Sequence, residues 1–353
     1  MAESKQGRVS VIIPARNEEA NIARVVSSLA AQEGLREILV VDDHSEDRTA
    51  QILESLQAKI PNLRVMRTNS LPAGWTGKTY AAATGAHAAS GDWLLFTDAD
   101  TEHMPGSLAA LLERAEREGA DLLSLSPGQS TDTVWEKCVI PLVYAHLARL
   151  YRFRDVSDPA SPAAAANGQY VLIRRSAYER AGGHEAVRGA ILEDVELARR
   201  VKSAGDRLLF LPGSQWVITR MYGSFSEMWR GWTKNLYLLY GRNVTRMLAT
   251  LAELWLLDLL PALAFLGLAL AWALGVAADW TLLAAMAFFL LAVWRQWTYS
   301  QALGRIGFDP GLAAYQTTGA AILGLLLLNS ARAYRLGGKV QWKGRVYSTE
   351  GRK

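Results

Sequence analysis

The chain has 353 residues, which is enough for two domains of ordinary size or for one domain and a membrane part. Its hydrophobic content of 50% is unevenly spread, because residues 251–331 are nearly free of charge while residues 1–248 resemble a soluble protein in composition. The formal net charge is +4, and much of the positive excess lies around residues 220–246 and after Arg332, beside the apolar block. This placement favours a membrane surface over nucleic acid as the partner.

Cys138 is the single cysteine, which excludes an internal disulfide and a cysteine-based metal site and fits a reducing compartment. The sequence before Pro14 has no apolar run long enough for a signal peptide. We therefore expect the front part of the chain to stay in the cytoplasm.

The front part alternates between strand and helix patterns. Short β-rich runs occur at residues 9–13, 37–41, 63–67 and 93–97. Helical spacing of apolar residues follows the first two runs, and a further helix is expected to begin near Lys78. This alternation predicts an α/β fold with a mostly parallel, Rossmann-like sheet, whose ligands bind at the carboxyl ends of the strands.

Polar clusters follow three of these strands, at residues 14–18, at Asp42-Asp43 and at Asp98-Ala99-Asp100. Polar loops and helix caps explain any one cluster equally well, but three on one rim favour a ligand site. If the chain stays extended, Asp98 and Asp100 point the same way and repel each other unless a cation lies between them. A Mg²⁺ or Mn²⁺ ion carrying a nucleotide diphosphate would supply that charge.

The motifs VSVIIPARNEE, ILVVDDHSEDRT and FTDADTEH, in this order and spacing, resemble those of inverting family 2 glycosyltransferases with the GT-A fold. The resemblance covers residues 1–240. It implies a nucleotide pocket lined by Pro14, Ala15, Arg16 and Glu18, with Asp43 at the base, Asp98 at the ribose or the metal, and Asp100 as a metal ligand.

Gly77-Lys78-Thr79 invites a comparison with a P-loop, but Pro72 stands where that motif needs its first glycine. At a helix start, Lys78 would either meet a phosphate or ribose of the nucleotide or be a solvated lysine. The Gly-Trp-x-Gly-Lys form is similar to that of a subgroup that includes carotenoid and hopanoid glycosyltransferases.

Glu193 and Asp194 follow a short apolar run and open a helix, a position where acidic residues are common because of the helix dipole. They also stand where the family has its acceptor-side Glu-Asp motif. The resemblance implies that Asp194 is the general base, which takes the proton of an acceptor hydroxyl during a single inverting displacement. With a carboxylate acceptor, Asp194 would orient the acceptor instead.

Two further segments are candidates for the acceptor side. The Asn167-Gly168-Gln169 turn and the Gly182-Gly183-His184 loop resemble family segments near the donor sugar and acceptor, so His184 either touches substrate or supports the fold. Residues 225–248 mix aromatic and basic side chains, which is typical of a helix at the headgroup level. There Arg230, Trp232 and Lys234 would meet either the leaving diphosphate or the membrane.

Three apolar segments, at residues 251–278, 280–294 and 312–331, predict transmembrane helices, with a buried helical bundle as the alternative. Three full spans would place Arg335, Lys339, Lys343 and Arg345 outside, against the positive-inside rule. Either the third segment is re-entrant or interfacial, which we prefer, or the rule fails for this chain.

The predicted domains are a GT-A domain at 1–224, an interfacial amphipathic segment at 225–248, transmembrane helices at 249–335 and a basic tail at 336–353. The predicted protein is a multi-pass cell-membrane enzyme with a cytoplasmic catalytic domain. It would use a divalent metal to move one sugar from a nucleotide sugar, expected to be a UDP-sugar, to a lipid such as a hopanoid or carotenoid. Nucleic acid is not an expected partner.

Two alternatives stay open. A processive polysaccharide synthase is disfavoured because Trp229-Arg230-Gly231-Trp232 replaces the Gln-x-x-Arg-Trp motif. A non-catalytic nucleotide-binding membrane protein is disfavoured because the acidic motifs are intact. A nicotinamide dehydrogenase would need Gly-x-Gly-x-x-Gly after the first strand, and this sequence lacks it.

Overall fold

A computed structural model of the chain describes residues 8–336, 339–342 and 345–348. The chain divides into two compact units. The first comprises the chain up to Gln129 together with residues 151–221, and the second comprises residues 130–150 and the chain from Tyr222 onwards. The predicted first domain, 1–224, therefore needs a correction, because residues 130–150 pack with the second unit.

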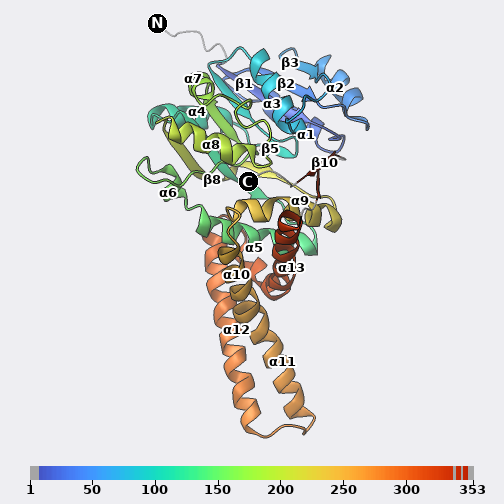
Figure 1. The fold of residues 1–353 in the computed structure, drawn as a ribbon, viewed down its shortest axis with the longest axis vertical. Coiled ribbons are helices and arrows are strands. Elements are labelled where there is room, and N and C mark those ends of the chain that lie inside the picture. Colours follow the sequence, from blue (N-terminus) through green and yellow to red (C-terminus); the bar gives the residue numbers. More distant parts are fainter. Residues whose placement is uncertain (1–7, 337–338, 343–344, 349–353) are drawn as a thin grey trace. The chain divides into compact units, whose positions relative to one another are not determined.

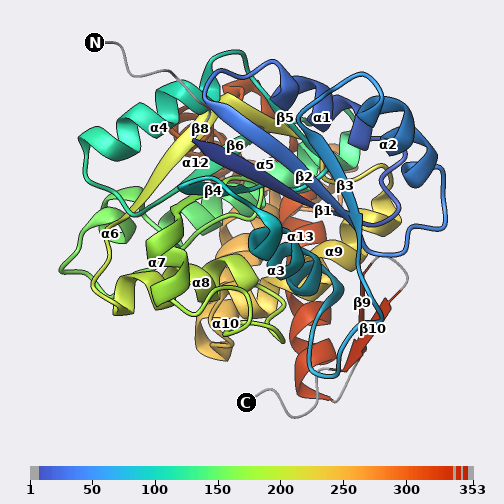
Figure 2. The ribbon, with the colours of Figure 1, turned by 90° about the horizontal axis from the view of Figure 1, so that it is seen from above.

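The first unit is built on an eight-stranded mixed sheet with the strand order β3-β2-β1-β4-β7-β6-β8-β5 (Figures 1 and 2). The strands are β1 (Val9–Ala15), β2 (Leu35–Asp42), β3 (Leu63–Arg67), β4 (Trp93–Phe96), β5 (Thr101–His103), β6 (Leu122–Gln129), β7 (Val171–Arg174) and β8 (Leu208–Thr219). β1 pairs in parallel with β2 and β4, whereas β7 is antiparallel to both β4 and β6. The parallel half of the sheet is thus the part that the alternating pattern predicts.

The order of the strands reverses at β1. The chain runs from β1 to β2 and β3 on one side and then returns to β4 on the other side of β1. Ligands of open α/β sheets bind at such a switch point, outside the carboxyl ends of the strands. Ala15 ends β1, Asp42 ends β2, and Asp98 follows β4, so all three predicted polar clusters belong to this rim.

Helices cover both faces of the sheet. They are α1 (Ile22–Ala30), α2 (Thr49–Gln57), α3 (Gly77–Ala88), α4 (Ser107–Arg117), α6 (Phe153–Ser157), α7 (Arg175–Arg180) and α8 (Glu193–Ser203). Because successive strand residues point to opposite faces, Val11 and Ile13 join a core with α1, α2 and α4, while Ile12 joins a second core with α3, α7 and α8.

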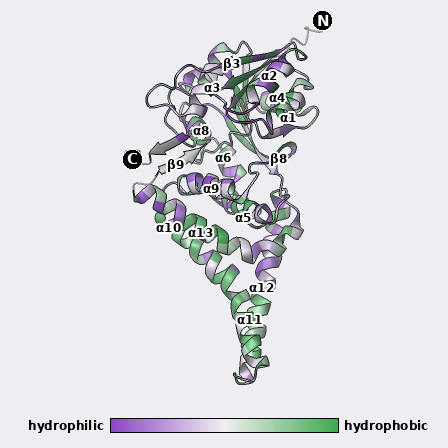
Figure 3. Cartoon of the chain, turned by 90° about the vertical axis from the view of Figure 1, so that its right-hand side faces the viewer, coloured by the Kyte–Doolittle hydropathy of each residue, from purple (hydrophilic) through white to green (hydrophobic). Residues whose placement is uncertain are grey.

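The second unit is helical with a small β-ribbon. Its helices are α5 (Val134–Leu150), α9 (Phe225–Leu239), α10 (Val244–Glu253), η1 (Leu254–Leu259), α11 (Leu260–Ala273), α12 (Trp280–Arg305), η2 (Pro310–Tyr315) and α13 (Gln316–Arg335), and its strands are β9 (Lys339–Trp342) and β10 (Arg345–Ser348). Helices α11 and α12 pack together as a hairpin (Figure 1), and hydrophobic residues are concentrated along it (Figure 3).

Three helical segments are long and apolar enough to cross a membrane: Val244–Ala273, Trp280–Arg305 and Pro310–Arg335. They differ in burial, since half of the apolar window of the third is buried, against 17% and 11% for the first two. The third segment is buried because α13 packs against α5, α9 and η1.

Residues 225–248 differ from the expected single surface helix. They form two helices, α9 and the start of α10. Trp232, Tyr237 and Tyr240 are buried, and Trp232 packs edge-on against Tyr144. These aromatic side chains belong to the core of the second unit and do not form an exposed aromatic belt. The predicted basic tail, 336–353, lies partly outside the described residues.

Candidate active site

The start of α3 is fixed by reciprocal capping bonds and by close packing. The hydroxyl of Thr76 accepts a hydrogen bond from the backbone N–H of Thr79, and the Thr79 hydroxyl in turn accepts one from the Thr76 N–H. Further along the helix, a Cβ on Gly85 would lie 2.5 Å from Cγ2 of Ile12, so only glycine allows α3 to lie this close to β1. These contacts hold Lys78, the second residue of α3, over the rim of the sheet.

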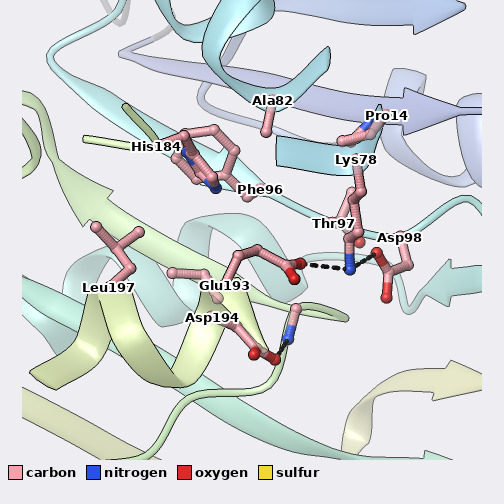
Figure 4. Close-up of a pocket in the computed structure, with 12 residues that line it drawn as sticks. Pro14, Lys78, Ala82, Phe96, Thr97, Asp98, His184, Glu193, Asp194 and Leu197 are labelled. Carbon is pink, nitrogen blue, oxygen red and sulfur yellow. Dashed lines mark hydrogen bonds and ion pairs between the residues drawn. The ribbon is translucent and has the colours of Figure 1, made fainter. Parts of the chain in front are cut away.

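Lys78 joins two carboxylates that come from distant parts of the sequence. Its Nζ lies 2.7 Å from Oδ1 of Asp98 and 2.8 Å from Oε1 of Glu193 (Figure 4). Burial opposes the charge of Lys78, but the charges of Asp98, Glu193 and Asp194 raise the pKa of Lys78 well above its ordinary value. The solvated-lysine alternative is therefore wrong, because only 24% of the side chain is exposed and its charge is paired twice.

Both oxygens of Asp194 are held by backbone N–H groups. Oδ2 accepts a hydrogen bond of 2.7 Å from Gly168, and Oδ1 accepts one of 2.8 Å from Val195. Burial and the negative charge of Glu193 raise the pKa of Asp194 to about 7, against the opposing effects of Lys78 and of the two N–H groups. A carboxylate with such a pKa can exchange a proton near neutral pH, as a general base must.

Gly168 lies where these charged groups converge. A Cβ at this position would be 2.9 Å from Nζ of Lys78 and 3.5 Å from Oδ2 of Asp194. The surrounding pocket is lined by residues from six separate segments of the first unit, including Pro14, Lys78, Asp98, Gly168, Glu193 and Asp194. The Asn-Gly-Gln turn was a visible signal, but the sequence did not reveal that Gly168 bonds Asp194.

The Asp-x-Asp motif does not continue the strand before it. β4 ends at Phe96, and Ala99 and Asp100 form a turn before β5, so the extended geometry assumed for Asp98 and Asp100 is wrong. The carboxylate of Asp98 meets Lys78, and the backbone oxygen of Asp100 accepts from the N–H of Arg220 at 3.3 Å. The cation beside Asp98 is thus a lysine.

A metal ion would need further oxygen ligands. Among the residues that the structure describes, no group of three or more histidine, cysteine, aspartate or glutamate side chains is arranged to hold one. Mg²⁺ at nucleotide sites is, however, usually bound by one or two carboxylates together with substrate phosphates and water. Asp98 and Asp100, two residues apart in the loop after β4, are the carboxylates of the donor-side motif that could supply such ligands.

The loops after β1 and β2 are tied together. Nη1 of Arg16 donates to the backbone oxygens of Asp43 at 2.6 Å and His44 at 3.0 Å. Asn17 and His44 have φ values of 53° and 57°, in the left-handed region that residues other than glycine rarely adopt. Residues in such rarely populated backbone conformations cluster at functional sites, and their presence in both loops is consistent with a binding site there.

The remaining nucleotide candidates lie along the same loops. Ala15 and Asp43 are buried, and Oδ1 of Asp43 accepts from the Thr68 hydroxyl at 3.2 Å. The backbone N–H of Glu18 donates to the Thr49 hydroxyl at 2.8 Å, which fixes the loop after β1.

Of the five acceptor-side candidates of the sequence, Glu193 and His184 line this pocket. His184 lines the pocket, but it is buried and its backbone N–H donates to the hydroxyl of Tyr178 at 3.0 Å. Burial and the charge of Lys78 lower the pKa of His184 to about 3, so its ring is neutral at pH 7. Arg230, Trp232 and Lys234 belong to the second unit, and their role toward the diphosphate stays a prediction.

Comparisons with known proteins identify the family of the chain. The family described as "Glycosyl transferase family 2" matches residues 10–182. A 4,4'-diaponeurosporenoate glycosyltransferase of Staphylococcus haemolyticus is 30% identical over 274 residues, covering 74% of this chain and 69% of that protein. The protein of the same name from Staphylococcus aureus strain MRSA252 is 27% identical over 251 residues, covering 70% of this chain and 65% of its own length.

A solved structure supports the fold class. The mannosyltransferase from Pyrobaculum calidifontis, solved in complex with GDP-Man and Mn²⁺, aligns with a TM-score of 0.53 and 19% identity over 92% of this chain and 86% of that one. The predicted α/β fold of the GT-A type followed by apolar helices is confirmed. The sheet is mixed, whereas the sequence predicted a mostly parallel one.

Proposed function

The chain belongs to glycosyl transferase family 2, and from this premise we propose that it moves one sugar from a nucleotide sugar to a lipid acceptor with inversion at the anomeric carbon. One observation carries the proposal. Asp98, from the donor-side motif, and the acceptor-side pair Glu193 and Asp194 meet in a single pocket through Lys78. The names of the two relatives, which specify a carotenoid acid, support a lipid as the acceptor.

Asp194 is the residue proposed to move the proton. Its carboxylate is fixed by the N–H groups of Gly168 and Val195, and each oxygen keeps a second lone pair for an acceptor hydroxyl. As the acceptor oxygen bonds to the anomeric carbon, its proton passes to Asp194 and the bond to the nucleotide diphosphate breaks. A single displacement of this kind needs no enzyme nucleophile.

The donor side is proposed to use the loops after β1, β2 and β4. Asp43 would receive the base, and the backbone around Pro14 and Ala15, braced by Arg16, would shape the pocket together with Glu18. Asp98 and Asp100 would hold Mg²⁺ or Mn²⁺, which when bound neutralises charge on the donor diphosphate. A UDP-sugar is the expected donor.

The test of this function uses membranes that contain the protein and a panel of radiolabelled nucleotide sugars. We expect label from a UDP-sugar to enter an organic-soluble lipid that carries a single sugar. Label in a growing polysaccharide would favour the processive alternative, and UDP binding without transfer from any donor would favour the non-catalytic one.

We further propose that the hairpin of α11 and α12 crosses the bilayer and that α13 does not. The hairpin exposes large apolar side chains along its length, among them Leu263, Leu266, Leu283 and Leu290. In contrast, α13 is covered by α5 and α9 of the same unit. Arg305 and Arg335 then lie on one side, together with the catalytic unit in the cytoplasm, which agrees with the positive-inside rule.

A polar network at the base of the hairpin supports this arrangement. The carboxylate of Asp258, whose side chain is 2% exposed, lies 2.8 Å from Arg295 and accepts from Gln316 at 3.1 Å. Glu253 bridges Arg295 and Arg149. Asp258 and Arg295 are thus mostly buried within the second unit, and each charge of the network has a partner, as ionisable groups near a membrane require.

Single-cysteine labelling tests this topology. The native Cys138 is 2% exposed and can be replaced by serine to remove its background. With a membrane-impermeant maleimide, cysteines at positions 305 and 335 should react from the same side, and a cysteine at 279 from the opposite side. Reaction of position 335 from the side of position 279 would show that α13 crosses the membrane.

A further inference from the structure

The amino group of Lys78 has little capacity left for a ligand. An ammonium group has three donors, and two of them are directed at Asp98 and Glu193 at 2.7 and 2.8 Å. Gly168 lies close to the amino group as well, since a Cβ added at Gly168 would be 2.9 Å from Nζ. Lys78 is thus enclosed by two carboxylates and a backbone turn (Figure 4), which is poor geometry for receiving a phosphate.

Glu193 needs the charge that Lys78 supplies. Its side chain is 8% exposed, and it directly precedes Asp194 in the first turn of α8. Two adjacent carboxylates at one buried helix start repel each other, and the helix dipole offsets only part of that cost. Removing the partner of a buried charge is strongly unfavourable, whereas removing both members of a pair costs much less.

We infer that Lys78 is a positioning residue for Asp194: it compensates Glu193, fixes the start of α8 against the Gly168 turn, and leaves nucleotide recognition to the loops after β1, β2 and β4. The inference rests on the proposed function, because it assigns Asp194 a role in the transfer. It also gives Glu193 a part in the arrangement, since Lys78 pairs with both Glu193 and the donor-side Asp98.

The groups around Asp194 agree with this assignment. Lys78 is the cation that faces it, Glu193 is the neighbouring anion, and His184 is neutral at pH 7. The charge of Lys78 favours the ionised form of Asp194, and the charge of Glu193 opposes it. Loss of Lys78 alone leaves two buried carboxylates side by side, but loss of Lys78 and Glu193 together leaves one.

The test is a charge-compensation cycle of Lys78→Met, Glu193→Gln and the double variant, with Lys78→Arg as the conservative change. Turnover at saturating donor, donor KM, and UDP affinity by calorimetry with Mn²⁺ are measured. We expect Lys78→Met to lower kcat by about tenfold or more while UDP affinity stays within about threefold. The double variant should have several-fold higher kcat than Lys78→Met, and Lys78→Arg should keep most activity.

Lys59→Met is the matched control. Lys59 is exposed on the same unit, so this variant should change neither kcat nor UDP affinity. If Lys78→Met fails to fold while the double variant folds, the compensation of Glu193 is supported directly. The inference is overturned if Lys78→Met weakens UDP binding about tenfold at unchanged kcat, or if the double variant is no better than Lys78→Met. Failure of the proposed function looks different: the wild type itself would then transfer no sugar.

Discussion

The backbone N–H of Gly168 donates a 2.7 Å hydrogen bond to Oδ2 of Asp194, across 26 residues of sequence. This bond joins the turn before β7 to the first residues of α8, and it fixes the carboxylate that we propose as the base. A Cβ at position 168 would lie 2.9 Å from Nζ of Lys78 and in ordinary contact with Oδ2 of Asp194 at 3.5 Å, so an added side chain would displace the Lys78 ammonium beside the base.

Gly168→Ala is therefore expected to lower kcat by about tenfold to a hundredfold, since a small displacement of a positioned base is costly. UDP affinity should change little, because the nucleotide loops are not touched. Gly267→Ala is the matched control, as an added Cβ there meets no atom within 4 Å. Unchanged kcat in Gly168→Ala would show that the Gly168 contact does not position the base.

The pH dependence follows from the raised pKa of Asp194. Because its pKa is about 7 and the base must be ionised, turnover with a hydroxyl acceptor should fall as the pH drops through neutrality. The measurement is kcat between pH 5 and 9 at saturating donor. A rate that stays constant below pH 6 would indicate a carboxylate acceptor, for which Asp194 is not needed as a base.

The same pKa predicts a gain in stability on removing Asp194. A carboxyl group with a folded-state pKa above its unfolded value binds more protons in the folded state, so its ionisation destabilises the fold as the pH rises between about 4 and 7. The difference in unfolding midpoint, Asp194→Asn minus wild type, should therefore increase as the pH rises from about 4 to 7. An equal difference at pH 4 and pH 8 would contradict the raised pKa.

The parallel half of the sheet in the first unit was predictable from the sequence because it rests on local patterns. The alternation that sends Val11 and Ile13 to one core and Ile12 to the other is visible in five consecutive letters. The pairing of Lys78 with Glu193 leaves no such local sign, because the two residues are brought together only by the packing of α3 and α8 on one face of the sheet.

Two predictions from the sequence were wrong for the same physical reason: the direction of the Asp98 side chain and the assignment of α5 to the first domain. The direction of Asp98 depends on where β4 ends, and a strand end is set by its neighbours as much as by its own residues. Likewise, α5 looks like any apolar helix of the first domain, although its partner α13 lies far along the chain. Gly319 of α13 marks this contact, since a side chain there would meet the backbone oxygen of Cys138.

Metal dependence can be tested at Asp100. If Asp98 and Asp100 hold the ion, Asp100→Asn should weaken Mn²⁺-dependent UDP binding by about tenfold or more without unfolding the protein. Glu102→Gln removes an exposed carboxylate two residues away and should leave binding unchanged. Equal UDP affinity of wild type and Asp100→Asn in both Mn²⁺ and EDTA would exclude this metal site.

The polar network of the second unit predicts a non-additive effect on stability. Asp258→Leu should destabilise the protein in detergent by about 3 kcal/mol, because it leaves the partly buried Arg295 with one partner fewer. The double change of Asp258→Leu with Arg295→Met should cost less than the sum of the two single changes. Asp279→Asn, at the exposed end of the hairpin, serves as the control, and additive costs would contradict the pairing.

The most direct test of the account measures sugar transfer to lipid and nucleotide binding together in Asp194→Asn. We expect wild-type membranes to label a lipid from a UDP-sugar, and the variant to bind UDP and Mn²⁺ like wild type while its turnover falls by about 10²- to 10⁴-fold. Turnover near the wild-type rate in Asp194→Asn, with the protein folded and UDP bound, would contradict the assignment of Asp194 as the base.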